Sequence, residues 1–261
     1  MKDELMEKID IIKNVLDFIA VDSVDDAAFN DLALKLFAYQ FRNNDPFMKF
    51  ARRRGKTPRT VKSWMDIPAV PINAFKTLDL SCSPITEAKA IFMTSGTTLG
   101  GVRGKSYHPT LDVYDASMHR NLRDRFMGKY ERIKMGILFP PPAIMPNSSL
   151  AHYLALADRD IGLCESGHLV DTNGIQFDAL FDALTESEQT NEPYALLGAS
   201  FSLVHLLDEM ERTHLKVNLP PGSRILDTGG FKGKSRELEP DDFNKKIYEF
   251  LDGHKLSLIH I

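Results

Sequence analysis

Short apolar runs alternate with amphipathic stretches after about residue 90, and this alternation constrains the fold more than any other feature of the chain. The apolar runs have the length of β-strands and cover residues 90–93, 135–139 and 194–197, and residues 224–227, with charged ends, form a further predicted strand. The stretches with apolar residues at helical spacing cover 110–127, 149–157, 175–184, 201–212 and a last one that opens at Pro240. Strands that alternate with helices form a mostly parallel sheet covered by helices on both faces. The predicted fold class is therefore α/β.

The region before this alternation predicts helices followed by irregular chain. Apolar residues recur at helical spacing from Leu5 to Ile19, and Asp25-Asp26 and Asp45-Pro46 are typical starts of two further helices. After Lys56, prolines break the pattern into extended pieces. The expected domains are an N-terminal helical segment at 1–55, a C-terminally incomplete α/β core at 56–253, and a non-native tail at 254–261. The tail is set apart because residues 256–261 resemble translated sequencing-adapter sequence.

Composition and charge exclude several classes of protein. The net charge of −4 argues against nucleic acid or an anionic membrane as the main partner. The two cysteines form no zinc-binding spacing and no disulfide framework, and both are expected to be buried structural thiols. The histidines form no metal-binding motif, and no apolar run is long enough to span a membrane. We therefore expect a cytoplasmic protein with no metal cluster.

Three loops that follow predicted strands are rich in Gly, Ser or Thr, and the most distinctive follows Met93. In parallel sheets, functional residues lie on loops just past the carboxyl ends of strands. Residues 94–104 contain four hydroxyl side chains and four glycines. Glycines let the backbone approach an anion, and hydroxyls donate to phosphate oxygens. Arg103 and Lys105 could neutralise a leaving pyrophosphate. The loop predicts phosphate binding, and the alternative is a plain Gly/Thr turn between two strands.

Two other catalytic motifs nearly fit. Gly100 and Gly104 are separated by three residues, whereas a Walker A loop needs four. Residues 198–202 have serine where the nucleophile elbow GxSxG has its last glycine. Ser200, Asp227 and His254 nevertheless follow the chain order of the α/β-hydrolase triad. A serine hydrolase or acyltransferase with Ser200 as nucleophile therefore stays an alternative, beside a serine-rich turn that only caps a helix.

Several segments together resemble one family of enzymes. Residues 92–98 are similar to the phosphate-loop signature of the adenylate-forming superfamily, and residues 227–232 to the Gly-Gly motif that packs against adenine in these enzymes. Residues 46–50, 64–71 and 74–76 resemble the acyl-protein synthetase branch of that superfamily. This branch includes the bacterial long-chain-fatty-acid–luciferin-component ligase of bioluminescence and is related to phenylacetate–CoA ligases. The resemblance covers nearly the whole chain.

The resemblance implies an activity and a role for each motif. Such a ligase uses ATP and Mg²⁺ to convert a fatty or other carboxylic acid to an acyl-adenylate. The acyl group then passes to a thiol of a protein or of CoA, in a reductase complex in some members. The fold would be that of the large N-terminal domain. The phosphates would be held by Thr94, Ser95, Gly96, Thr97 and Thr98, with Arg103 and Lys105 as catalytic cations. The adenine would lie against Gly229, Gly230 and Phe231, and the acyl and adenylate groups beside Gly198, Ala199, Ser200 and His152.

The sequence also departs from the family pattern. Leu99 stands where glycine is common, and no proline follows in the loop. The aromatic-Gly-x-Thr-Glu segment, the ribose-binding aspartate and the catalytic lysine of the superfamily do not occur before Ile261. Neither Cys82 nor Cys164 matches the acyl-accepting cysteine. We therefore expect a fragment with weak turnover, and a non-catalytic nucleotide-binding module is a third hypothesis. His152 is equally well explained as an exposed residue at a helix start.

Overall fold

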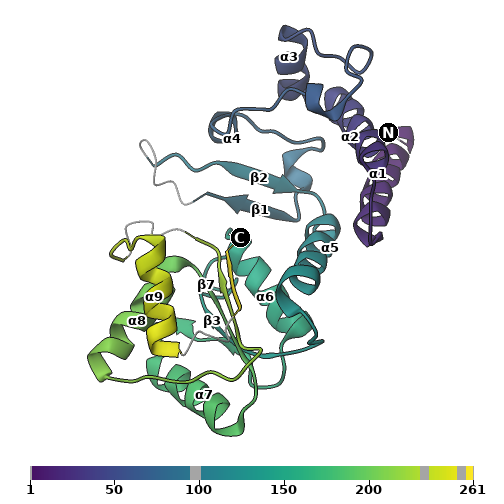
Figure 1. The fold of residues 1–261 in the computed structure, drawn as a ribbon. Helices are drawn as coiled ribbons and strands as arrows, with labels where there is room; N and C mark the ends of the chain where they lie inside the picture. The colour runs from purple at the N-terminus through teal and green to yellow at the C-terminus, as the bar shows by residue number, and fades with distance from the viewer. Residues whose placement is uncertain (1, 95–100, 230–234, 252–256, 261) are drawn as a thin grey trace. The chain divides into compact units, whose positions relative to one another are not determined.

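A computed structural model describes residues 2–94, 101–229, 235–251 and 257–260 (Figure 1). The chain divides into two compact units, residues 1–120 and residues 121–261. The domain boundaries expected at residues 55 and 253 stay a prediction. Within the described residues, no helix has the length and apolar character needed to cross a bilayer.

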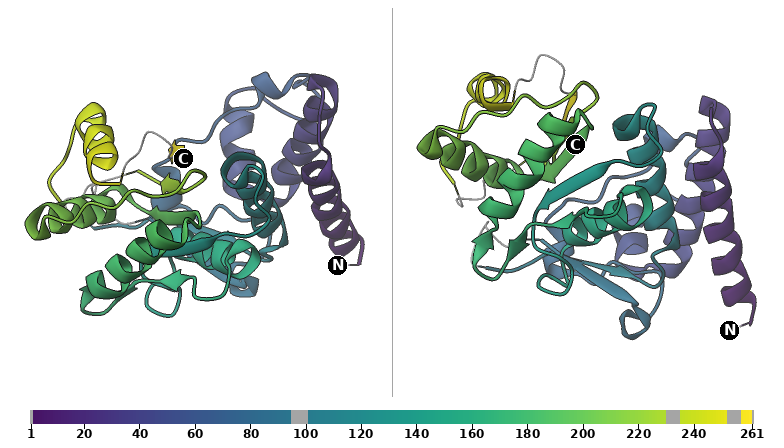
Figure 2. Two further views of the ribbon diagram at one scale, coloured as in Figure 1. Left: turned by 60° about the horizontal axis from the view of Figure 1, so that its bottom comes forward. Right: turned by 90° about the horizontal axis from the view of Figure 1, so that it is seen from below.

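Unit 1 begins with three helices, as the sequence predicts. These are α1 (Lys2–Ala20), α2 (Asp26–Asn43) and α3 (Asp45–Arg53). The side chain of Asp25 caps α2 by accepting from the Ala28 amide, and Asn44 caps α3 by accepting from the Phe47 amide. The helices α1 and α2 lie side by side (Figure 2), with an ion pair between Glu7 and Arg42. A small aromatic core holds α2 and α3 together through Phe37, Phe41, Phe47, Ala51 and Val61.

The rest of unit 1 is mostly irregular until a β-hairpin. Three short helical turns occur at η1 (Trp64–Asp66), α4 (Ala74–Thr77) and η2 (Ile85–Glu87). Strand β1 (Ala90–Met93) then pairs antiparallel with β2 (Lys105–His108). The expectation that residues 90–93 join the parallel sheet is therefore wrong. The connection between the two strands is too short for the helical crossover that a parallel pair requires.

Unit 2 contains one five-stranded parallel sheet. Its strand order is β4-β3-β7-β8-β9. The strands are β3 (Lys134–Leu138), β4 (Gly167–His168), β7 (Tyr194–Gly198), β8 (Arg224–Asp227) and β9 (Ser257–His260). A separate two-stranded hairpin is formed by β5 (Val170–Asp171) and β6 (Gly174–Ile175). The sequence predicted β3, β7 and β8 to within about a residue and missed β4 and β9. The edge strand β9 lies within the segment that the sequence set apart as a tail.

Helices cover both faces of this sheet. The helices of unit 2 are the π-helical turn η3 (Leu122–Met127), which continues α5 (Asp112–Asn121), and α6 (Ser149–Ile161), α7 (Phe177–Thr190), α8 (Ser200–Thr213) and α9 (Pro240–Leu251). The chain moves one way across the sheet through α6 and the other way through α7, α8 and α9. Because parallel crossovers are right-handed, α6 lies on the face opposite the other three (Figure 1). The α/β fold class is confirmed.

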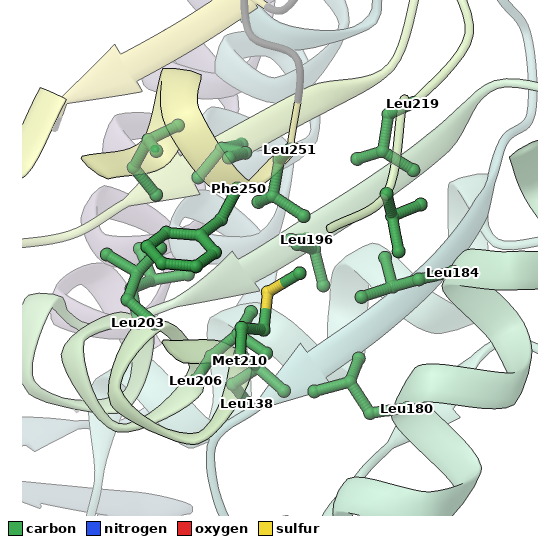
Figure 3. Packing of buried hydrophobic residues seen from close by; sticks show 14 of the residues in the cluster. Leu138, Leu180, Leu184, Leu196, Leu203, Leu206, Met210, Leu219, Phe250 and Leu251 are labelled. Carbon is green, nitrogen blue, oxygen red and sulfur yellow. The ribbon is translucent and has the colours of Figure 1, made fainter. Parts of the chain in front are cut away.

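The main core of unit 2 lies between the sheet and α7, α8 and α9. Alternate residues of the strands point into it, such as Leu196 of β7 and Ile225 of β8, both fully buried. Figure 3 shows Leu180 and Leu184 of α7 and Leu203, Leu206 and Met210 of α8 packed with Phe250 and Leu251 of α9. This packing fixes α8, which begins two residues after β7 ends.

Candidate functional site

The connections of the sheet create one position where a ligand crevice is expected. After β3 the chain crosses to β4 on one side, and it later forms β7 on the other side of β3. The connections at the carboxyl ends of β3 and β7 therefore leave in opposite directions, which is a topological switch point. Ligands of open α/β sheets bind outside the carboxyl ends of the strands at such a point. A ligand of unit 2 is therefore expected at the loops after β3, β7 and β8.

A buried serine and a buried aspartate join the loops after β7 and β8. Ser200, the first residue of α8, donates its hydroxyl to both carboxylate oxygens of Asp227, at 2.9 Å to Oδ1 and 3.0 Å to Oδ2. The exposed fractions of the two residues are 4% and 3%. Asp227 Oδ1 also accepts from the Gly229 amide at 2.9 Å. The carboxylate thus holds donors from both loops, next to the positive end of the α8 dipole.

A second contact strengthens the connection between the same loops. The carbonyl oxygen of Gly198 accepts from the Thr228 amide at 3.0 Å and from the Thr228 hydroxyl at 3.2 Å. A side chain at Gly198 would lie 3.3 Å from the Cβ of Leu138, so glycine lets β3 and β7 pack closely here. Gly229 has a φ of +74°, a left-handed conformation that favours glycine. The two loops are therefore fixed to each other by backbone and side-chain hydrogen bonds.

A large cavity lies at the carboxyl end of β3, entirely within unit 2. Its volume is about 750 Å³, within the range of small-molecule sites. One wall is a single face of α8, because its residues there follow helical spacing from Phe201 through His205 to Arg212. This wall extends about 16 Å at 1.5 Å of rise per residue. The other walls come from the end of β3, the β5–β6 hairpin and the start of α7, and include Leu138, Phe139, Val170, Ile175 and Phe177.

The cavity is apolar where it approaches the strands and charged farther along α8. Asp208 pairs with Arg236, and Glu209 pairs with Arg212 through two hydrogen bonds of 2.8 and 2.6 Å. These four side chains satisfy one another's charge. A ligand with a long apolar part therefore fits the cavity better than a polyanion such as a nucleotide.

In unit 1 the structure describes the base of the Gly/Thr loop. The Thr94 amide donates to the Gly104 carbonyl oxygen at 3.0 Å, and the Gly104 amide donates to the Thr94 hydroxyl at 2.9 Å. Arg103 and Lys105 are exposed on either side of the buried Gly104. Ser95, Gly96, Thr97, Thr98 and Leu99 lie outside the described residues. The strands β1 and β2 flank this segment, and the choice between a phosphate-binding loop and a plain Gly/Thr turn stays a prediction.

A comparison with models of protein families shows which family the chain belongs to. The family described as acyl-protein synthetase, LuxE, matches residues 2–260. The chain belongs to this family. No curated protein matches the chain. Members of the acyl-protein synthetase family are ligases that activate a fatty acid and transfer it to a protein, so this chain is an enzyme of that class. The resemblance to acyl-protein synthetases in the sequence is thereby confirmed.

The structure brings some of the predicted acyl-protein synthetase residues together. Gly198, Ala199 and Ser200 lie at the carboxyl end of β7, and hydrogen bonds join Gly198 to Thr228 and Ser200 to Asp227, next to Gly229. Gly230, Phe231 and His254 lie outside the described residues. His152 is half-buried in the first turn of α6, where its amide donates to the Ser148 carbonyl oxygen. Among the described residues that line the cavity, His152 and Ser200 do not occur, whereas Phe201 and Ser202 do.

The geometry does not favour the serine-hydrolase hypothesis. A hydrolytic triad places a histidine between the nucleophilic serine and the aspartate. Here the Ser200 hydroxyl donates directly to the Asp227 carboxylate. A hydroxyl in this arrangement serves to anchor the carboxylate rather than to attack a substrate.

The acyl-transfer step needs a thiol, and the two cysteines of the chain differ in burial. Burial raises the pKa of the half-buried Cys82 thiol to about 11, so this thiol stays protonated. The expectation that both cysteines are buried is wrong, because Cys82 is only half-buried and Cys164 is exposed in the turn after α6. Over the described ranges, no group of three or more His, Cys, Asp or Glu side chains is arranged to hold a metal ion.

Proposed function

We propose that this acyl-protein synthetase activates a long-chain carboxylic acid with ATP, forms an acyl-adenylate, and transfers the acyl group to a thiol of a protein or of CoA. The observation that carries the proposal is the apolar cavity beside the Ser200–Asp227 contact at the switch point of the sheet. A fatty acid needs an apolar chamber for its tail, and its carboxylate needs polar groups at one end of that chamber.

The proposal assigns the acid to unit 2. Its tail lies among the apolar residues of the cavity, such as Phe139, Val170 and Phe177. Its carboxylate lies at the loop after β7, beside Gly198, Ala199 and Ser200. A carboxylate oxygen attacks the α-phosphorus of ATP, and the bond to pyrophosphate breaks. A thiolate sulfur then attacks the acyl carbon, and AMP leaves. Catalysis of both steps consists of positioning and charge stabilisation.

The proposal assigns the nucleotide to two glycine-containing loops. The loop from Thr94 to Thr98 holds the phosphates, and Arg103 and Lys105 stabilise the charge on the leaving pyrophosphate. The loop after β8, from Gly229 to Phe231, borders adenine. Mg²⁺ would assist by neutralising the phosphates, and none of the described residues is assigned to it. A partner protein or reductase subunit that accepts the acyl group belongs to the same proposal.

The test combines acid binding with ATP–pyrophosphate exchange. We expect exchange that depends on the acid and grows with its chain length. Val170→Trp reduces the volume of the cavity, and it should raise the KM or Kd for long acids by about tenfold or more while short acids change little. Val21→Trp is the matched control, because Val21 is 52% exposed in unit 1.

The outcome also separates the other two hypotheses. A chain that binds ATP without acid-dependent exchange would support the non-catalytic module. Stoichiometric fluorophosphonate labelling that disappears in Ser200→Ala would support the hydrolase. An unchanged chain-length profile in Val170→Trp would contradict the assignment of the cavity to the acyl tail.

A further inference from the structure

We propose that Asp227 is a positioning residue, which sets the backbone of the nucleotide-binding loop after β8 against the start of α8. The inference rests on the proposed function, because it explains how the adenine-bordering loop acquires its geometry. Asp227 reaches this loop and α8 through its carboxylate and does not itself need to touch a substrate.

The first argument is the convergence of donors on one carboxylate. The Ser200 hydroxyl and the Gly229 amide come from two different loops, and both donate to Asp227 Oδ1 at 2.9 Å. Ser200 also reaches Oδ2 at 3.0 Å. Hydrogen bonds to an ionised acceptor are roughly twice as strong as those between neutral groups. One side chain thus fixes both loops at the carboxyl edge of the sheet.

The second argument is burial. Asp227 is 3% exposed and Ser200 is 4% exposed, so water offers them little alternative hydrogen bonding. A buried carboxylate is costly unless its oxygens are satisfied, and an apolar residue of similar size would often serve stability as well. A carboxylate at this position is therefore better explained by the backbone geometry that it imposes than by its contribution to the core.

The third argument is the conformation of the residues that the carboxylate holds. Gly229 adopts a φ of +74°, and its amide points back to Asp227. Thr228 is held separately by the Gly198 carbonyl oxygen. Both residues of the loop are therefore held by hydrogen bonds. The carboxylate also stabilises the N-terminus of α8. The N-cap residue Ala199 has no side-chain oxygen, and the Asp227 carboxylate supplies negative charge there instead.

The experiment measures ATP and acid affinity separately in the full chain. Asp227→Asn keeps the size of the side chain but removes its charge and one acceptor oxygen. We expect the Kd or KM for ATP to rise about tenfold, equivalent to about 1.4 kcal/mol, with the value for a long-chain acid changed less than about twofold. Asp241→Asn is the matched control. It makes the same change at an exposed residue in the first turn of α9, and it should leave both affinities unchanged.

A second measurement keeps the inference independent of ATP binding. Hydrogen-exchange mass spectrometry of the unliganded protein should show faster exchange at peptides containing Gly229 in Asp227→Asn, and a smaller increase in Ser200→Ala. Ser200→Ala also decides the case if Asp227→Asn does not fold. If the wild-type chain binds no ATP but exchange around Gly229 rises in the variants, the proposed function fails and the positioning role stands. Unchanged exchange at Gly229, or equal losses of ATP and acid affinity, would overturn the inference.

Discussion

Gly128 occupies a turn that only glycine accommodates well, and its substitution gives a stability prediction that can be worked out in detail. The residue follows the π-helical turn η3 with a φ of +57° and a ψ of −115°, and the Tyr130 amide donates to the Met127 carbonyl oxygen at 3.1 Å. These angles and this bond define a type II′ turn with Gly128 at its second position. A Cβ there would lie 2.6 Å from Arg224 Nη2.

Two costs add in Gly128→Ala. A non-glycine residue in such a sparsely populated backbone region costs about 1–3 kcal/mol. The Arg224 guanidinium, now 5.6 Å from the centre of the Tyr130 ring, must move away, and its cation–π contact is worth about 0.5–1 kcal/mol. Burial already lowers the pKa of Arg224, so its charge is partly desolvated where it lies. We expect the free energy of unfolding to fall by about 1.5–4 kcal/mol.

The assay is urea unfolding followed by circular dichroism. Fluorescence is unsuitable, because the single tryptophan, Trp64, lies in unit 1 and reports on that unit. Gly229→Ala is the control for backbone strain alone, since Gly229 has a φ of +74° and a Cβ added there would meet no atom within 4 Å. Combining Gly128→Ala with Arg224→Met removes the clash and should recover the part of the loss that exceeds this control.

The reasoning would be refuted by either of two results. One is a Gly128→Ala variant as stable as the wild type, which would mean that the turn relaxes freely. The other is an effect no larger than that of Gly229→Ala, which would mean that Arg224 moves aside without cost.

Two further predictions concern the core and the surface of unit 2. Leu196→Ala should lower the free energy of unfolding by about 2–5 kcal/mol, because Leu196 is fully buried in the central strand β7. Leu163→Ala, at a side chain 48% exposed, should change it by about 0.5 kcal/mol or less. Equal effects of the two substitutions in urea unfolding would contradict the described core. Lys134 lowers the pKa of Glu165 through a 2.9 Å hydrogen bond, so the resulting stability is present above the usual carboxyl pKa and is lost as the pH falls through the lowered pKa. Lys134→Met should therefore weaken the loss of thermal stability on acidification, and an identical pH profile of the melting temperature would rule this out.

The sequence predicted the three central strands β3, β7 and β8 of the sheet well, because each contains a short apolar run. Residues 194–197 needed no information from elsewhere in the chain, since strands buried on both faces have apolar residues at nearly every position. It missed β4 and β9 at the two edges of the sheet. Strand β1 was wrongly assigned to the parallel sheet, because its own residues do not show which strand it pairs with. Its pairing is set by the short connection between the strands, and the second strand, Lys105–His108, is polar enough to be overlooked.

The candidate site was predicted only in part. The sequence placed Ser200 beside the acyl and adenylate groups and Asp227 in the Gly-Gly motif, with a hydrolase triad as the alternative. Sequence order could not show that this hydroxyl and this carboxylate, 27 residues apart, bond directly. The cavity was missed. Its α8 wall has a helical spacing that could have been noticed from Phe201 to Arg212, but its other wall includes a hairpin of two-residue strands that leaves no periodic signal.

The unequal burial of the two cysteines has a practical consequence for studies of the two units. Cys82 belongs to unit 1 and Cys164 to unit 2. Thiol reagents react with the thiolate, so the exposed Cys164 is open to labelling in the folded protein, whereas the half-buried Cys82, with its raised pKa, should react more slowly. Modification of Cys164 therefore serves as an internal reference for modification of Cys82. The ratio of the two would report changes in the exposure of Cys82 within unit 1, without any change to the sequence.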